Sequence, residues 1–463
     1  MAFPSNFLWG AATSSYQIEG AVDQDGRGSS IWDDFCETPG KVINGDTGAV
    51  AIDHYNRMPS DLEIMTELGL QAYRFSIAWP RIKPSGSGYV ETRGLDFYDR
   101  LIDGLLARGI EPLPTLYHWD LPSALQQRGG WTNRETAFHF ADYTSVVVDK
   151  FKDRVDRWAT LNEPWVSAFL GHAAGIHAPG LTDPAAAFSA AHHLLLAHGK
   201  AVEVIRDVAP NSKVGIVLNM APVYLTEAAP EDHPAHQSIK LQDAMLNRFW
   251  MDSVLKGSYP EVLTELGDVV MESVQAGDLV EISRPIDWIG VNYYQDSRSV
   301  PVTNSESAAT LDSTGNGAMP GQRGISPAEP VGEVTDFGWS TTPEGLRNLL
   351  VMLKNDYPGL PEIVITENGC AYDDPMIDGR VNDVRRISYL NGHLKSVSQA
   401  IDAGVNVVGY MVWSLFDNFE WAEGYRQRFG IIHVDFETLE RTLRESARWY
   451  ANVIKTNGDS VVG

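Results

Sequence analysis

The sequence contains very little cysteine, with only Cys36 and Cys370 among its 463 residues. Two cysteines cannot build a disulfide framework, and no Cys/His spacing suggests a structural zinc site. The first residues lack the basic start and long apolar core of a signal peptide, and no run of 18 uncharged apolar residues occurs. We therefore expect a cytoplasmic protein that needs no metal and enters no membrane.

Basic residues are also scarce. Lys and Arg total 36 against 61 Asp and Glu, which gives a formal net charge of -25. Such a surface repels nucleic acids and anionic membranes, so a neutral small molecule is the expected partner. The 13 Trp residues are enough to stack on sugar rings, although core packing is the more common use of any single Trp. The oligomeric state stays open.

The order of apolar runs predicts the fold class. A chain of this length has room for two or three domains, but single α/β barrels with long loops also reach it. Short β-branched and aromatic runs alternate with longer amphipathic stretches, which is typical of βα units around a parallel sheet. Strands are predicted at residues 7–16, 72–79, 111–118, 155–162, 213–219, 288–294, 362–366 and 407–413. Eight units predict one (β/α)₈ TIM barrel, with long βα loops, over residues 1–463.

The stretches between these strands contain helices and one unusual segment. Helices are predicted at residues 59–68, 94–108, 135–151, 184–208 and 244–256. Residues 301–334 are rich in Ser, Thr, Gly, Pro and Ala without a sustained period. A domain linker is one interpretation. We favour a long loop after the sixth strand, because a linker would leave the last two strands in a fragment too small to close. Residues 456–463 are expected to form a frayed tail.

Two glutamates follow predicted strands on opposite sides of such a barrel. Glu163 comes after the fourth strand and Glu367 after the seventh, and catalytic groups of these barrels lie at the carboxyl ends of strands. A single carboxylate there more often caps a helix, but two across one mouth suit glycoside hydrolysis. Arg74, at the end of the second strand, is placed to keep Glu367 ionised, although pairing with another acid fits equally well. Tyr294 is a candidate hydroxyl donor to the same carboxylate.

Neutral polar and aromatic side chains occur at the same strand ends. His118, Trp119, Asn162 and Asn292 would bind sugar hydroxyls without adding charge, although a lone His is more often a core residue. After the eighth strand, residues 413–421 read WSLFDNFEW, which combines two indoles with Glu420. This pattern favours a platform on which a sugar stacks beside a carboxylate that binds its hydroxyls.

Several longer strings resemble a known family. They are FLWGAATSSYQIEG at 7–20, TLNEP at 160–164, ITENG at 365–369, and the shorter YHWDLP, HAPG, NYY and SLFDNFEW. These strings are spread over more than 400 residues and follow one another in the order of a known family. The chain resembles the glycoside hydrolase family 1 β-glycosidases along nearly its whole length. The resemblance implies a retaining enzyme that uses no cofactor, with Glu163 as general acid/base and Glu367 as nucleophile. Arg74, Tyr294 and Asn292 complete the predicted catalytic set.

The resemblance also implies which residues bind the substrate. Hydrogen bonds to the non-reducing sugar are expected from Gln17, His118, Asn162 and Glu420. Aromatic contacts are expected from Trp413 as the stacking floor, Trp421 beside it, and Trp165 and Trp339 on the leaving-group side. Trp119 and Phe429 complete the predicted set.

Two branches of the family differ from this chain. The thioglucosidase branch has glutamine in place of Glu163, and the phosphoglycosidase branch has serine in place of Glu420. Both carboxylates are present here, and Glu420 would repel a phosphate. The expected activity is therefore hydrolysis of non-reducing terminal β-D-glucosyl residues from β-glucosides or cello-oligosaccharides, by double displacement through a covalent intermediate.

Two alternatives remain open at this stage. One is an enzyme that prefers β-galactosides or β-fucosides, and the other is a sugar-binding protein that has lost catalysis. A retaining enzyme requires its two carboxyl groups about 5 to 5.5 Å apart. The natural aglycone cannot be predicted, because variable loops build the leaving-group side.

Overall fold

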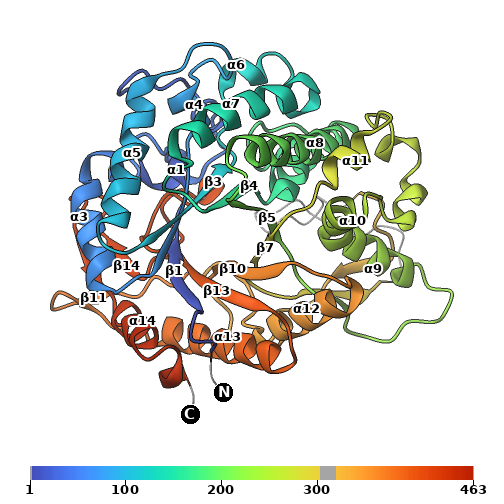
Figure 1. The fold of residues 1–463 in the computed structure, drawn as a ribbon. Coiled ribbons are helices and arrows are strands. Elements are labelled where there is room, and N and C mark those ends of the chain that lie inside the picture. The colour runs from blue at the N-terminus through green and yellow to red at the C-terminus, as the bar shows by residue number, and fades with distance from the viewer. Residues whose placement is uncertain (1–2, 303–319, 462–463) are drawn as a thin grey trace.

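The computed structural model describes residues 3–302 and 320–461. Eight parallel strands form a closed barrel in the order β1-β13-β10-β7-β5-β4-β3-β2, with the longer helices around it (Figure 1). The barrel strands are β1 (Leu8–Ala12), β2 (Ala72–Ser76), β3 (Glu111–Tyr117), β4 (Arg157–Asn162), β5 (Lys213–Asn219), β7 (Trp288–Asn292), β10 (Glu362–Asn368) and β13 (Val407–Trp413). The predicted (β/α)₈ barrel is confirmed.

Most strand ends differ from the prediction by a few residues. The prediction of a first strand over 7–16 was wrong at its end, because β1 stops at Ala12 and a short helix, α1 (Ser15–Ile18), begins there. At the start of α1, the N–H of Ser15 donates to a side chain of β2, Ser76 Oγ, at 2.7 Å. β10 runs past its predicted end, and Glu367 pairs with Asn292 of β7. Glu367 therefore lies inside its strand and pairs with β7, while the next residue, Asn368, pairs with Val412 of β13.

Two of the helix predictions match the structure at both ends, and a third is close. α7 (Glu135–Phe151) and α8 (Pro184–Val208) have the predicted bounds, and α5 (Thr92–Leu106) differs by two residues at each end. The predicted start at Pro59 was wrong, because α3 (His54–Glu67) begins five residues earlier and contains Pro59. Pro59 has no N–H and cannot donate one of the helical hydrogen bonds, and burial of His54, Tyr55 and Met58 offsets the stability that is lost.

The predicted helix 244–256 is two segments of a longer helical run. α9 (Ala235–Asp243) leads into a π-helical turn, η4 (Ala244–Arg248), and then α10 (Phe249–Lys256). The remaining helices are α2 (Ile31–Cys36), α4 (Trp79–Ile82), α6 (Ser123–Gln126), α11 (Asp278–Ile282), α12 (Pro343–Asp356), α13 (Val384–Asp402), α14 (Glu445–Lys455) and the π-helical η3 (Val166–Ala174). Within the described ranges, no helix is long and apolar enough to cross a membrane.

Three small sheets lie in the loops outside the barrel. The first contains β6 (Val223–Leu225), β8 (Ser297–Pro301) and β9 (Ile325–Pro327). The second pairs β11 (Met376–Ile377) with β12 (Arg380–Val381), and the third pairs β14 (Ile432–Val434) with β15 (Arg441–Leu443). The segment 301–334 follows the sixth barrel strand as predicted, but β9 lies within it and pairs with β8. Residues 303–319 of that prediction lie outside the described residues.

The first and last described segments of the chain pack together, close to the N and C marks in Figure 1. Trp9 Nε1 donates to Asn457 Oδ1 at 3.0 Å, and Asn457 Nδ2 in turn donates to the carbonyl of Phe3 at 3.2 Å. Val461 is buried. The prediction of a frayed tail was therefore wrong for residues 456–461, because a turn packs them against the first strand.

The barrel interior is filled with side chains below its mouth. Small residues such as Ala12, Ala72 and Ala159 share one buried cluster with the fully buried indole of Trp288. Gly215 faces this ring so closely that an added Cβ would lie 2.6 Å from it. A closed floor leaves only the carboxyl ends of the strands as a place for a substrate.

Candidate active site

A cavity of about 720 Å³ opens at the carboxyl ends of the barrel strands. Its wall includes the carboxylates of the buried Glu163 and Glu367 and of the half-buried Glu420. The cavity volume falls within the range of small-molecule sites, and its wall mixes aromatic rings with a few convergent polar groups. The two glutamates that the sequence singled out thus face one shared space.

Glu367 has two strong partners. Arg74, from β2, places Nη1 2.6 Å from Oε1, and the Tyr294 hydroxyl donates to Oε2 at 2.7 Å. Burial raises the pKa of Glu367, and the Arg74 charge and these hydrogen bonds oppose that rise. The pairing of Arg74 with Glu367, one of two options from sequence, is the one that occurs.

Glu163 has a different environment. Asn292 Nδ2 donates to its Oε1 at 2.7 Å, and this neutral amide is the one side-chain hydrogen bond that the described contacts give it. Burial and the nearby negative charge of Glu367 both raise the pKa of Glu163. Arg74 forms its ion pair with Glu367 and not with Glu163, so it stabilises the charged form of Glu367 more strongly than that of Glu163.

Asn162 connects the surroundings of both carboxylates. Its Oδ1 accepts from Arg74 Nη2 at 2.6 Å and from Asn292 Nδ2 at 3.1 Å. Its amide Nδ2 lies 3.1 Å from His118 Nε2, which must accept because the amide nitrogen can only donate. Burial lowers the pKa of His118 well below its usual range, so the ring is neutral and its proton is on Nδ1.

Glu420 lies in another part of the cavity wall, which we call the second wall. Gln17 Nε2 donates to its Oε2 at 3.2 Å, and burial together with the charge of Glu367 raises the pKa of Glu420 well above its usual range. The rings of Trp413 and Trp421 both stack on His118, with centroids 5.9 Å apart in each pair. This wall offers flat apolar faces next to a carboxylate.

Aromatic rings also form the opposite, outer side. Trp339 stacks on Phe337 with ring centroids 4.2 Å apart. Phe429 belongs to the same buried cluster as Trp413 and borders this side, 6.0 Å from Trp339. Trp165 lines the cavity near Glu163 and packs on Phe169. These rings give the outer side apolar faces among polar residues.

Three residues of the site have a left-handed backbone that non-glycine residues seldom adopt. The φ angles are 79° at Trp119, 43° at Glu163 and 52° at Trp421. Each such residue costs about 1 to 3 kcal/mol and persists only where its surroundings hold it. Strain concentrated at these positions supports a functional role for the cavity.

The structure brings all the predicted site residues together, in two layers. The cavity wall contains His118, Trp119, Glu163, Trp165, Asn292, Tyr294, Trp339, Glu367, Trp413, Glu420, Trp421 and Phe429. Gln17, Arg74 and Asn162 lie just behind it, and each contacts one of these residues. The second layer orients the first.

Sequence reasoning missed several residues of the outer wall. Asn219 ends β5, so the strand-end argument applied to Glu163 would also have found it. Phe337 stands two residues before Trp339 and had only that proximity as a signal. Gln242 and Ser297 come from a helix and a small strand without any motif. Across the described ranges, no group of three His, Cys, Asp or Glu side chains is placed to hold a metal ion.

Comparisons with known proteins agree with this geometry. The sequence model of glycosyl hydrolase family 1 matches residues 1–459. Beta-glucosidase A of Thermotoga maritima is 47% identical over 458 residues, covering 98% of each chain. Beta-glucosidase A of Acetivibrio thermocellus is 46% identical over 464 residues, covering 99% of each.

Solved structures and a further relative point the same way. The structure of the Thermotoga maritima beta-glucosidase in complex with glucoimidazole has a TM-score of 0.90 and 46% identity, with 99% of each chain covered. A Bifidobacterium breve protein named bifunctional beta-D-glucosidase/beta-D-fucosidase is 42% identical over 466 residues, covering 98% of each chain. The chain belongs to glycosyl hydrolase family 1.

Proposed function

We propose that this family 1 enzyme is a retaining β-glucosidase that uses Glu367 as nucleophile and Glu163 as general acid/base. The observation that carries this assignment is the asymmetry of the two carboxylates. Arg74 and Tyr294 contact Glu367, whereas Glu163 has only the neutral amide of Asn292. An ionised and a protonated carboxyl group facing one cavity are what double displacement at a glycosidic bond requires.

The reaction proceeds in two steps. Glu367 attacks the anomeric carbon while the proton of Glu163 passes to the departing aglycone oxygen, which leaves a covalent glycosyl ester on Glu367. Glu163, now ionised, removes a proton from water, and the resulting hydroxide displaces the ester with net retention. Arg74 and Tyr294 stabilise the carboxylate that attacks and later leaves, and Asn292 orients Glu163. No cofactor takes part.

The substrate is a neutral glucoside with its non-reducing end at the Glu420 wall. Glu420, with Gln17 behind it, binds sugar hydroxyls, and the indole of Trp413 supports the ring face. Glu420 supplies an acid and not a cation at this position, which disfavours phosphorylated sugars. β-Glucosides and cello-oligosaccharides fit, with the aglycone between Trp165 and Trp339. The bifunctional Bifidobacterium relative favours added activity on β-fucosides, and β-galactosides remain a further candidate.

The sequence also predicts the domain organisation and the location of this enzyme. We propose that residues 1–463 form one catalytic domain, since family 1 matches the chain from end to end. A cytoplasmic location, based on the shortage of cysteine, remains a prediction.

The variant Glu367→Gly tests the nucleophile. Loss of the carboxylate should lower kcat on a nitrophenyl β-glucoside by more than about a thousandfold. Added azide or formate fits the vacated space and should restore part of the activity. Glu362→Gln is the matched control, because Glu362 begins the same strand and pairs with Arg157 and Lys213 away from the cavity. It should keep normal turnover.

The outcomes also separate the enzyme from a sugar-binding protein. Ordinary turnover by Glu367→Gly would remove Glu367 from the reaction. A wild-type protein that binds glucosides but releases no nitrophenol would favour a binding function.

A further inference from the structure

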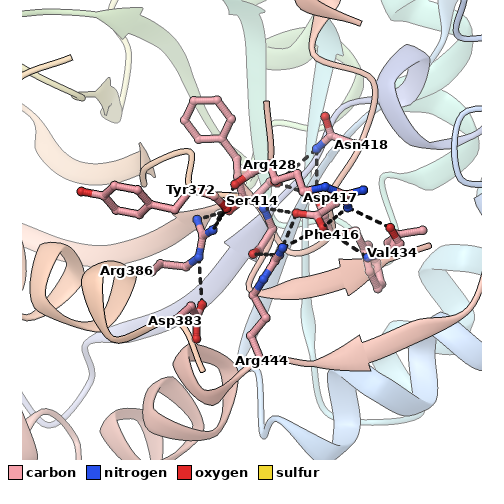
Figure 2. A network of polar contacts seen from close by, with 12 residues as sticks. Tyr372, Asp383, Arg386, Ser414, Phe416, Asp417, Asn418, Arg428, Val434 and Arg444 are labelled. Atoms are coloured by element: carbon pink, nitrogen blue, oxygen red, sulfur yellow. Dashed lines mark hydrogen bonds and ion pairs between the residues drawn. The ribbon is translucent and has the colours of Figure 1, made fainter. Parts of the chain in front are cut away.

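A network of buried charged side chains lies behind one wall of the cavity (Figure 2). Its centre is Asp417, in the loop after β13. Its carboxylate accepts from Arg444 at 2.7 and 3.0 Å and from Arg428 at 2.8 Å. It also accepts from the backbone N–H groups of Gly430 at 3.0 Å and Val434 at 3.3 Å. Burial alone would raise the pKa of Asp417, but the Arg444 charge holds it below the ordinary value.

Arg386, on α13, forms the second anchor of this network. Its guanidinium donates to four backbone carbonyls, those of Cys370, Tyr372, Arg428 and Phe429. Its Nε donates to Asp383 at 3.0 Å, and Asp383 accepts from the N–H and hydroxyl of Ser446 on α14. One side chain therefore ties together the loop after Glu367, the loop that carries Phe429, and two outer helices.

The anchored loops carry the second wall of the cavity. Trp413 precedes Asp417 by four residues and Glu420 follows it by three. Asn418, next to Asp417, accepts from Gln17 Nε2 at 3.1 Å, and Gln17 also donates to Glu420. A shift of Asp417 would therefore move Glu420 through the backbone and through Gln17.

The other carboxylate is separate from this network. Glu163 lies after β4 and contacts Asn292, which contacts Asn162. In the described contacts, none of these residues touches Asp417, Arg386 or their partners. A substitution in the network should therefore weaken sugar binding more than it slows proton transfer from Glu163.

Burial of so many charges is not explained by stability alone. A buried ion pair must overcome the loss of hydration, and apolar replacements of similar volume are often at least as stable. A fully hydrogen-bonded polar network instead fixes a single geometry. We propose that the Asp417–Arg444–Arg428 cluster, together with Arg386 and Asp383, positions the wall formed by Trp413, Glu420, Trp421 and Phe429 for the non-reducing sugar. This assignment rests on the proposed binding of a glucosyl group at that wall.

The variants Asp417→Asn and Arg444→Lys keep volume while breaking the hydrogen-bond pattern. Both should raise Ki for deoxynojirimycin, a glucose-shaped iminosugar, by about tenfold. They should also raise KM for a nitrophenyl glucoside. The ratio of kcat/KM between dinitrophenyl and nitrophenyl glucosides, which reports proton donation by Glu163, should stay at the wild-type value. Circular dichroism and the melting curve check that each variant is folded.

The matched control is Arg448→Gln. Arg448 lies on α14, four residues from Arg444, but its side chain is half exposed and pairs only loosely with Glu445 at 3.8 Å. This variant should keep the wild-type Ki. Arg428→Gln is a milder change, because the Asp417–Arg444 pair stays in place, and it should raise Ki by about two- to fivefold.

The outcomes distinguish a positioning role from a purely structural one. Folded Asp417→Asn and Arg444→Lys proteins with an unchanged Ki rule out positioning, as does a leaving-group ratio that shifts as much as Ki does. If these two variants do not fold, Arg428→Gln decides in the same way. Failure of the proposed function looks different, because the wild-type protein itself would then not cleave the glucoside.

Discussion

At the scale of single residues, neighbours give two identical side chains different chemistry. Glu163 and Glu367 are both buried at the barrel mouth, and burial favours the protonated form of each. Arg74 lies 2.6 Å from Glu367 and favours its ionised form, while the side-chain partner of Glu163 is the neutral amide of Asn292. The assignment of roles follows from these contacts rather than from the two glutamates themselves.

The pH dependence of kcat/KM should reflect this pair. Glu163 must be protonated to donate, and its pKa is raised, so activity is retained above the ordinary range of a carboxyl group and falls as pH rises through that pKa. The acidic limb should come from protonation of Glu367. In Glu163→Gln the alkaline limb should vanish on a dinitrophenyl glucoside, which needs no proton, and kcat/KM on poor leaving groups should fall by about 10² to 10⁴-fold. An alkaline limb that persists in this variant would assign it to another group.

At the scale of helices and strands, the sequence predicts those ends that neighbouring residues determine, such as a capped helix start. α8 has its predicted bounds because Asp183 caps it and Pro184 stands at its first position. α3 does not, because buried contacts carry that helix through Pro59. The end of β10 depends on pairing with β7 and β13, which is set by strands far away in the sequence.

The cap of α8 gives a test at this scale. Asp183 Oδ1 accepts from the N–H groups of Ala185 at 2.9 Å and Ala186 at 3.3 Å. Asp183→Ala should lower the free energy of unfolding by about 1 kcal/mol, because both donors lose their acceptor. Asp183→Asn keeps an acceptor and should stay close to the wild type. Thermal melting of the three proteins measures this, and equal melting temperatures for all three would show that the cap contributes little.

At the scale of the whole molecule, the barrel and the motif residues were predictable, but the connections between them were not. Alternating apolar runs predict eight strands, and the strand-end rule then predicts Glu163 and Glu367. The partners of Asp417, by contrast, come from the loop before β14, from β14 itself and from the residue that precedes α14, and no spacing in the sequence connects them. The outer wall at Gln242 and Ser297 was missed for the same reason.

The closed floor of the barrel gives a test of packing. Gly215→Ala would place a Cβ 2.4 Å from the Trp288 carbonyl oxygen and 2.6 Å from its ring, so about 1 to 3 kcal/mol of stability should be lost. Gly392→Ala is the control, because that helical glycine has only Pro343 within reach, at 3.4 Å or more. It should be neutral or stabilising by about 0.5 to 1 kcal/mol. Denaturant unfolding compares the two, and equal stability of both variants would contradict the packing.

The central claim is that Glu367 forms a covalent bond to the sugar. A 2-fluoro-glucoside with a dinitrophenyl leaving group should trap this species, because the fluorine slows both steps while the good leaving group keeps the first one fast. Intact-mass and peptide mass spectrometry should then find one fluoroglucosyl group per chain, on the peptide that contains Glu367. A label on another residue, or normal turnover with no label and an inverted product, would contradict the account.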